Sequence, residues 1–441
     1  MQVTSSYGAE IRKQNIPILH TLRIYRSAVS YLIRVYAEAW EELSGITDTK
    51  KRFNEAEHLV HTTKKNQARY DFDRYFPKLP SYLRRSAIQH ALGSIASYET
   101  RLELWKNGTL SGKPKLTLEN HAMPVFYREV MYREAGETEN AAYLKLYDGH
   151  DWKWFRAGLL HTDMEYLRRH WSGKKSSAPV LEKRHQKYFL RFSYTEEVTL
   201  SKTPVKDQII CSVDLGINTD AVCSIMWSDG TVLNRKFINF HSEKDRLSHV
   251  LGRIRRFQKE HGSRQIGSRW AYAKRLNTEL ARKTGRSIAE YAHENHADVI
   301  VFEYLEMKGK ISGKKRQKLH LWKKREIQTM CEHKAHRYGI RVSRVCAWNT
   351  SRLAYDGSGP VSRDPKNHSL CVFQSGKQYN CDLSASYNIG ARYWIREIIK
   401  TLPETERSSL EAKVPAVKRR TSCVYADLRK LYVEVNNLKA A

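Results

Sequence analysis

The chain has 441 residues, 41% hydrophobic and 28% charged, which is typical of a globular protein of two or three domains and argues against disorder. Lys and Arg outnumber Asp and Glu by 77 to 47, and the formal net charge of +30 predicts a polyanionic partner. There is no apolar run long enough to span a bilayer and no signal peptide pattern, so we expect a cytoplasmic location. Seven scattered cysteines do not indicate a disulfide framework.

The first part of the chain is predicted to be helical. Apolar residues recur at helical spacing from Pro17 to Gly45, and again from Leu79 to Trp105 before an Asn-Gly stop. From Ser111 to Pro204 the pattern changes to short alternating runs with turn dipeptides, which predict a basic, β-rich module.

After Pro204 the pattern indicates an α/β layer. The segment “QIICSVDLGI” predicts a buried strand, and “AVCSIMWSDGTVLNRKF” predicts a hairpin that turns at Asp229 and Gly230. Basic helices then alternate with the strands “ADVIVFEYL” and “IRVSRV”, before a last long helix. This order predicts a mixed sheet covered by helices.

Three acidic residues lie at the ends of these predicted elements. Asp214 ends the first strand, Glu303 ends the run “VIVFE”, and Asp382 begins the last helix. Neighbouring strand ends and the start of a packed helix can converge, although the residues are far apart in sequence. Clustered carboxylates repel one another unless a cation neutralises them, and their hard oxygens suit Mg²⁺ or Mn²⁺. We therefore predict a catalytic site that holds two ions about 4 Å apart for phosphodiester hydrolysis.

Each acid alone also has a structural interpretation. Asp214 can cap the turn after its strand, and Asp382 can be the N-cap of its helix. Glu303 is harder to explain in this way, because it directly extends a buried apolar run. The ordered set of three favours the metal site.

Several segments resemble motifs of a known family. “VDLGINTDAV”, “VIVFEYLEM” and “CDLSASYNIGAR” are similar to the three RuvC-like nuclease motifs of transposon-encoded TnpB proteins and compact type V CRISPR effectors. “HKAHRYGIRVSRVCAWNTSR” resembles the family's helix, strand and Thr-Ser element, here Thr350 and Ser351. Upstream, “SAIQHALGSIASYETRL” and “SGKPKL” resemble its recognition and wedge regions more loosely. The resemblance assigns the catalytic metal ligands to Asp214, Glu303 and Asp382.

The resemblance implies a multidomain α+β protein with a helical recognition unit and a β-barrel-like wedge domain, followed by an RNase H-like (RuvC) α/β nuclease domain. The expected divisions are the start of the wedge at 1–15, the recognition domain at 16–110, the wedge at 111–204, the nuclease domain at 205–348 and 381–400, a target-nucleic-acid-binding insert at 349–380, and a C-terminal tail at 401–441.

The implied function is Mg²⁺-dependent DNA cleavage guided by RNA. The partners would be a guide RNA, a double-stranded DNA target and the RNA–DNA heteroduplex, bound by a monomer or a homodimer on one guide, near the prokaryotic nucleoid. Two alternatives remain: a guided repressor that binds DNA without cutting it, and an RNase H-like transposase that needs no guide.

The insert departs from the family pattern. Family members usually form a zinc ribbon from two Cys-x-x-Cys pairs, but these positions fall here on Ala354, Gly357, Cys371 and Gln374. Three of the four ligands are missing, so we expect no structural zinc and a degenerate ribbon that contacts nucleic acid. An unusual zinc site remains an alternative, from His368 with Cys346, Cys371 or Cys381.

Basic or polar residues near these motifs are candidates for phosphate contacts, although each alone is also compatible with a solvated helix face. They are Arg84, Arg85, Gln89, Lys113, Lys115, Arg253, Arg255, Arg256, Lys314, Lys315, Arg316, Lys323 and Lys324.

Overall fold

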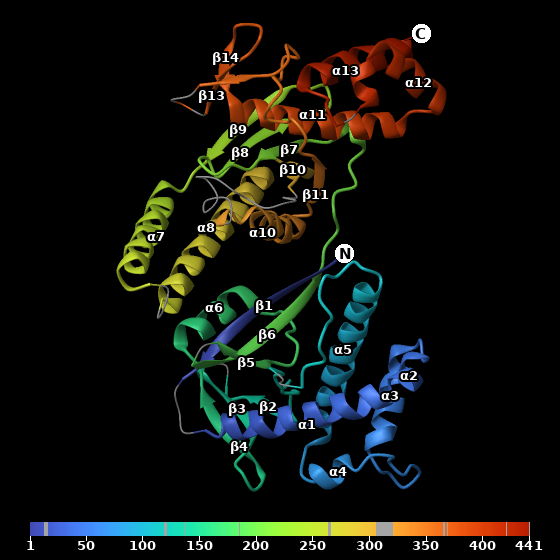
Figure 1. Cartoon of the computed structure of the whole chain (residues 1–441), viewed down its shortest axis with the longest axis vertical. Coiled ribbons are helices and arrows are strands. Elements are labelled where there is room, and N and C mark those ends of the chain that lie inside the picture. Colours follow the sequence, from blue (N-terminus) through green and yellow to red (C-terminus); the bar gives the residue numbers. More distant parts are fainter. Residues whose placement is uncertain are drawn as a thin grey trace. The chain divides into compact units, whose positions relative to one another are not determined.

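Figure 1 shows the computed structural model of the chain. It describes residues 1–12, 16–118, 121–136, 138–184, 186–262, 266–305, 321–364, 367, 369–419 and 421–440. They form two compact units, Thr4–Glu196 and the combination of Met1–Val3 with Glu197–Ala441. Within the described ranges, no helix is at once long and apolar enough to cross a membrane.

The unit Thr4–Glu196 combines helices with two small sheets. Its helices are α1 (Ile18–Glu38), α2 (Trp40–Ser44), α3 (Thr49–Val60), α4 (Phe72–Tyr75), α5 (Ser81–Lys106) and α6 (His161–Trp171). Its strands are β1 (Gln2–Ile11), β2 (Tyr132–Glu134), β3 (Ala141–Tyr147), β4 (Trp152–Gly158), β5 (Val180–Arg184) and β6 (Lys187–Glu197).

These strands form two open sheets, in the orders β1-β6-β5 and β2-β3-β4. Ile11 to Leu159 and Val125 to Val180 are isolated bridges, and in the described residues no continuous ladder joins the two sheets. A barrel needs a continuous hydrogen-bonded circuit. The expected β-barrel-like wedge is therefore corrected to two open three-stranded sheets in the part that the structure describes.

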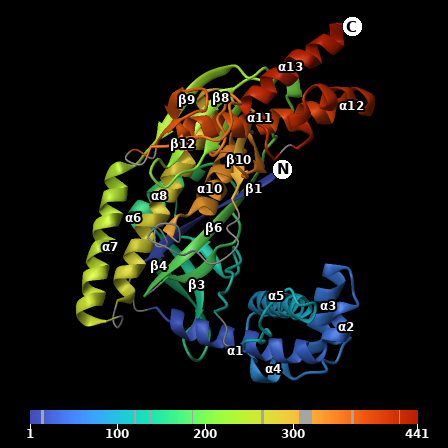
Figure 2. The ribbon, with the colours of Figure 1, turned by 45° about the horizontal axis from the view of Figure 1, so that its top comes forward.

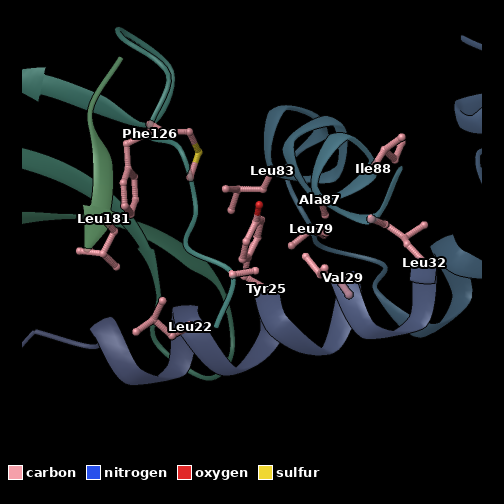
Figure 3. Packing of buried hydrophobic residues seen from close by; sticks show 14 of the residues in the cluster. Leu22, Tyr25, Val29, Leu32, Leu79, Leu83, Ala87, Ile88, Phe126 and Leu181 are labelled. Atoms are coloured by element: carbon pink, nitrogen blue, oxygen red, sulfur yellow. The ribbon is translucent and has the colours of Figure 1, made fainter. Parts of the chain in front are cut away.

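The core of this unit lies where α1 packs against α5, as Figure 3 shows. The apolar residues of α1 recur every three or four positions, so that Leu22, Val29 and Leu32 lie on one face. The Tyr25 hydroxyl is within 2.9 Å of the Ser86 hydroxyl, which satisfies both buried groups. The single helix predicted from Pro17 to Gly45 is interrupted at Ala39, between α1 and α2.

The other unit is built on a five-stranded sheet. Its strands are β7 (Ile210–Asp214), β8 (Ala221–Met226), β9 (Val232–Ile238), β10 (Val299–Tyr304) and β11 (Arg341–Cys346), in the order β11-β10-β7-β8-β9. β10 pairs in parallel with β7 and β11, whereas β8 pairs antiparallel with β7 and β9. The predicted mixed sheet is confirmed, and the hairpin turns at Gly230, whose φ of 89° suits glycine.

Helices cover both faces of this sheet (Figure 1). One face packs against α8 (Gly267–Glu294) and α10 (Lys324–Arg337), and the other against α11 (Cys381–Thr401). α7 (His241–His261) lies beside α8 in a helical pair (Figures 1 and 2) with a small apolar core of its own. A short 3₁₀ helix, η1 (Val205–Asp207), precedes β7.

The described residues after Thr401 are largely helical, although the sequence suggested a tail at 401–441. They form α12 (Glu404–Lys413), the 3₁₀ helix η2 (Pro415–Lys418) and α13 (Tyr425–Ala440). Leu410, Val417 and Leu428 are completely buried in the core shared with α11. This segment therefore packs against α11, the helix that covers one face of the sheet.

The insert between β11 and α11 contains a three-stranded sheet of β12 (Ser362–Arg363), β13 (Leu370–Val372) and β14 (Gln378–Asn380), in that order. A small core of Ala354, Cys371, Phe373 and Cys381 lies within it.

Candidate active site

The three predicted acids lie on the α11 side of the sheet. Asp214 is the last residue of β7 and Glu303 lies near the end of β10. Because side chains alternate between the faces of a strand, Asp214 shares the face of Ile210, and Glu303 that of Val299, which both pack toward α11. Ile210 and Val299 are partners in the parallel ladder. The same register, carried four residues along both strands, brings the two acids to corresponding positions.

Asp382 is the second residue of α11, the helix that covers this face. Its N-cap is Asn380, whose side-chain oxygen accepts the Leu383 N–H at 2.9 Å. The interpretation of Asp382 as an N-cap is therefore wrong, and its carboxylate is available for another role. The sheet register and the helix start thus bring together three acids that are far apart in sequence.

Burial and mutual repulsion act on the three carboxylates. Burial raises the pKa of Asp214 well above its usual range, and the charges of Glu303 and Asp382 raise it further. Burial also raises the pKa of Glu303, against a hydrogen bond from Thr350, and the pKa of Asp382, against the charge of Arg363. Asp214 and Glu303 expose only 8% and 7% of their surface. The site therefore disfavours three negative charges unless a cation is bound.

The turn after Asp214 brings Thr219 to the site. A Cβ at Gly216 would lie 2.5 Å from the carbonyl oxygen of Thr219, so the turn requires glycine. The side chain of Thr219 hydrogen bonds to Asp382, which lowers the pKa of that carboxyl. The “DLG” sequence thus fits this turn, in addition to supplying an acid.

Glu303 is held from two sides. The buried Thr350 hydroxyl donates to Glu303 Oε1, and Gln328 Nε2 donates to the Glu303 backbone oxygen at 2.9 Å. The resemblance pointed to Thr350 without a role for it, and the structure shows its contact with the candidate ligand.

Two arginines close to the acids were not singled out from the sequence. Arg363, on β12 of the insert, is exposed, and its charge lowers the pKa of both Asp214 and Asp382. Arg392, on α11, is buried, and its charge lowers the pKa of Glu303. No local pattern indicates either arginine, because the pairing depends on tertiary contacts.

The chemistry of the donors fits a divalent cation, because carboxylate oxygens are the hard ligands that such ions prefer, and because the charges of Glu303 and Asp382 oppose ionisation of Asp214 when no cation is bound. In the described part of the chain, however, no three His, Cys, Asp or Glu side chains are close enough to hold a metal ion. The three acids are electrostatic neighbours without a formed coordination shell. Asp214, Glu303 and Asp382 are the residues that would hold the ion.

Of the four positions that correspond to the family's zinc ligands, Ala354 and Cys371 lie in a packed apolar cluster, whereas Gly357 and Gln374 are exposed. Ala354 and Cys371 are fully buried, and the Cys371 thiol donates to the Tyr379 carbonyl oxygen at 3.3 Å. Cys381 packs beside Cys371, whereas Cys346 is exposed. His368 lies outside the described residues.

The candidate phosphate contacts differ in their surroundings. Arg84 is buried and pairs with Glu57 at 3.5 Å and Asp73 at 3.7 Å, so its side chain is held inside its own unit. Arg85, Gln89, Lys113 and Lys115 are exposed, as are three arginines of α7, namely Arg253, Arg255 and Arg256.

The remaining candidates lie near the start of α10. Lys323 pairs with Glu326, and Lys324 lies 5.6 Å from the centre of the Trp322 ring. The last three candidates, Lys314, Lys315 and Arg316, lie outside the described residues.

Comparisons with known proteins show what the segments and the fold of this chain are similar to. Residues 325–389 match the family model described as Cas12f1-like, TNB domain, and residues 5–148 match the Aq_aa04 family. A cryo-EM structure of a Cas12f1–sgRNA–target DNA complex has a TM-score of 0.50 and 17% sequence identity, over 84% of this chain and 82% of that chain. The chain has a Cas12f-like fold.

The predicted resemblance to compact type V CRISPR effectors is thereby confirmed. CasPhi-2 (Cas12j) bound to crRNA and phosphorothioate DNA is also similar, with a TM-score of 0.49 and 10% identity over 89% of this chain and 91% of that chain. No curated protein matches the sequence. In the Cas12f-like chain, the TNB match includes Thr350, Arg363 and Asp382, and so contains several of the residues around the acids.

Proposed function

We propose that this chain is an RNA-guided DNA endonuclease that hydrolyses phosphodiester bonds at Asp214, Glu303 and Asp382, with Mg²⁺ or Mn²⁺ as cofactor. The observation that carries the proposal is the position of Asp214 and Glu303 on one face of a mixed sheet, with Asp382 at the start of the covering helix, where the charges of Glu303 and Asp382 both oppose ionisation of Asp214. The strand order β9-β8-β7-β10-β11, with β8 antiparallel to its neighbours, supports an RNase H-like (RuvC) domain.

The residues have distinct roles in this proposal. The three acids hold the cation, and the Thr350 hydroxyl keeps one oxygen of Glu303 in a fixed direction. Arg363 is exposed beside the acids, where a positive side chain attracts a phosphate that the carboxylates repel. A divalent ion bound there supplies Lewis-acid stabilisation of the phosphate and lowers the pKa of the attacking water.

The partners are proposed from charge and fold together. A net charge of +30 suits a guide RNA, a double-stranded target and their heteroduplex, whose phosphates are held while base pairing supplies specificity. The solved Cas12f1 structure contains an sgRNA and a target DNA. We propose that this chain likewise binds a guide RNA and a target DNA, as a monomer or homodimer on one guide RNA in the prokaryotic cytoplasm. Its proposed domain divisions are those given above.

The test is guided cleavage by protein purified from its native locus with its bound RNA. Asp214→Asn and Glu303→Gln should bind a target that pairs with that RNA as the wild type does, and should fail to cut it in Mg²⁺. Matched charge losses at exposed positions, Asp245→Asn and Glu406→Gln, should leave cutting unchanged. Retained cutting by both site variants would refute the site.

Two outcomes with the wild-type protein would favour the alternatives. Tight binding programmed by the RNA, without nicking in Mg²⁺ or Mn²⁺, would indicate a repressor. Protein that carries no specific RNA and joins DNA ends would indicate a transposase.

A further inference from the structure

Two polar side chains lie one turn apart on α11 and are almost completely buried. Asn388 is 0% exposed and Arg392 is 2% exposed. Residues four apart lie on the same side of a helix. A buried amide or guanidinium destabilises the fold unless it is hydrogen bonded, so the partners of these groups show what they hold in place.

The partners lie at the end of β11 and in the turn that follows it. Asn388 Nδ2 donates to the carbonyl oxygens of Thr350 at 3.0 Å and Leu353 at 2.9 Å. Arg392 Nη1 donates to the carbonyl oxygen of Cys346 at 2.7 Å. The two side chains thus fix the backbone at both ends of residues 346–353.

The turn also has backbone hydrogen bonds of its own, from the N–H groups of Arg352 and Leu353 to the Asn349 carbonyl oxygen, and the α11 side chains add to these. Asn349 has a φ of 60°, a left-handed conformation that is uncommon for residues other than glycine. The next residue, Thr350, donates its hydroxyl hydrogen to Glu303 Oε1. The direction of the Glu303 carboxylate therefore depends on a loop whose conformation the α11 side chains maintain.

The same two side chains also reach the start of α13. Asn388 Oδ1 accepts the Tyr425 N–H at 3.0 Å, and Arg392 Nε donates to the Cys423 carbonyl oxygen at 3.0 Å. The Tyr425 hydroxyl in turn donates to the Gly230 carbonyl oxygen at 2.6 Å, in the β8–β9 turn. The C-terminal segment is thus tied to the helix and the loop on which Glu303 depends.

We propose that Asn388 and Arg392 are positioning residues of the candidate active site, which hold the Thr350 loop so that the Thr350 hydroxyl orients Glu303 toward the cation. This inference rests on the proposed function. Neither residue touches the reacting atoms; both act through Thr350. Partners of metal ligands typically change metal affinity or activity about ten- to a hundredfold when they are removed.

The experiment measures Mn²⁺ affinity by electron paramagnetic resonance, together with Mg²⁺-dependent guided cleavage. Thr350→Val keeps the size of the side chain and removes the hydroxyl, whereas Thr350→Ser keeps the hydroxyl. We expect Thr350→Val and Asn388→Ala each to weaken Mn²⁺ binding and to raise the Mg²⁺ concentration for half-maximal cleavage, about tenfold or more. Thr350→Ser should bind Mn²⁺ more tightly than Thr350→Val does, and target binding should not change in any of these variants.

A double variant separates positioning from general loss of stability. If Asn388 acts through Thr350, Asn388→Ala should add little to the metal-binding defect of Thr350→Val, because the two effects are coupled. Hydrogen exchange should speed up in residues 346–353 of Asn388→Ala in the metal-free protein. The control is Tyr393→Phe, the next residue of α11 after Arg392, which loses a buried 2.9 Å hydrogen bond to Gln208 and should not change metal dependence.

The inference is overturned if Thr350→Val or Asn388→Ala binds Mn²⁺ as the wild type does, if their defects simply add, or if Tyr393→Phe produces the same defect. Failure of the proposed function has a different signature. A wild-type protein that binds Mn²⁺ but never cuts DNA would refute the nuclease, while the Mn²⁺ affinities and the exchange rates would still decide the positioning roles. If Asp214→Asn binds Mn²⁺ as tightly as the wild type does, both the proposed function and the positioning roles are overturned.

Discussion

The two faces of the five-stranded sheet differ in chemistry although the same strands supply both. Toward α8 and α10, β7 and β10 present Cys211, Ile300 and Phe302, which are fully buried and apolar. Toward α11, the alternate positions include Ser212 and two acids. Both faces bury apolar residues, but the α11 face also buries two acids, whose charges are disfavoured unless the acids are protonated or bind a cation. The period of two along a strand makes this division possible.

The largest expected effect separates two adjacent residues on opposite faces. Phe302→Ala removes a fully buried ring and should lower the free energy of unfolding by about 3–5 kcal/mol. Glu303→Gln should abolish cleavage without lowering that free energy, because it removes a buried charge. Urea unfolding of both variants, with cleavage assays, checks this contrast. If both variants lost the same free energy of unfolding, Glu303 would be as important for stability as Phe302, and the expected difference between the two faces would be wrong.

The helices that cover the two faces approach through glycines. A Cβ at Gly285 of α8 would lie 2.7 Å from the Ile327 carbonyl oxygen, a backbone atom of α10, whereas at Gly390 of α11 it would lie 2.5 Å from Met226 Sδ. Gly285→Ala should therefore lower the free energy of unfolding by about 1–3 kcal/mol. Gly390→Ala should lower it less, because a thioether can change rotamer.

A glycine without near neighbours is the control for this pair. A Cβ at Gly93 in α5 would meet nothing within 4 Å, so Gly93→Ala should stabilise the helix by up to about 1 kcal/mol. Melting curves of the three variants give the comparison. A larger loss for Gly390→Ala than for Gly285→Ala would contradict the expected order.

The destabilisation caused by the buried acids on the α11 face should depend on pH. The pKa of Asp214 is raised in the folded state, so its contribution to stability is fully present below the usual range of an aspartate and is lost as the pH rises through the higher folded value. Metal-free Asp214→Asn should therefore melt a few degrees above the wild type at neutral pH, and at the same temperature in acid. Melting temperatures between pH 4 and 8 in EDTA, with Asp245→Asn as the control, test the sign. A lower melting temperature of Asp214→Asn at neutral pH would show that its charge is satisfied without a cation.

The smallest effect on stability is expected farther from the sheet, on the outside of α7. Arg253, Arg255 and Arg256 are exposed, so replacing all three by Ala should change stability by about 0.5 kcal/mol or less per site. Nucleic-acid affinity should fall, and its dependence on salt concentration should flatten by about 0.9 for each phosphate that the variant no longer neutralises. Binding measured from low to high salt checks this, and unchanged slopes would remove these residues from the interface.

Much of the unit built on the five-stranded sheet follows from the sequence by simple rules. Alternation of apolar residues and turn dipeptides predict the strands, and the acids were predicted from their places at the ends of elements, as Asp214 and Asp382 show. Contacts that depend on the tertiary fold were not predictable in this way. Asn388 reaches two carbonyl oxygens more than 30 residues away in sequence, and no local pattern indicates such a contact.

Two other differences between the sequence-based predictions and the structure have causes that are local in the sequence. Arg84 was grouped with the candidate phosphate contacts because it lies in a basic segment, but Glu57 and Asp73 hold it inside the helical unit. For the last forty residues a signal was present, since Leu428, Leu431 and Val435 recur at helical spacing. The many charged residues between these apolar positions made the helical spacing difficult to recognise.

The parallel ladder between β7 and β10 constrains the evolution of this chain. Because Val299 pairs with Ile210, and Glu303 lies four residues further on, a single codon inserted early in β10 would move Phe302 to the place of Glu303, and a single codon deleted there would move Glu303 to the place of Phe302. A benzyl group would then face the acids and a carboxylate would enter the apolar interior. Changes of length in this lineage should therefore accumulate in the connections between strands and be eliminated within these two.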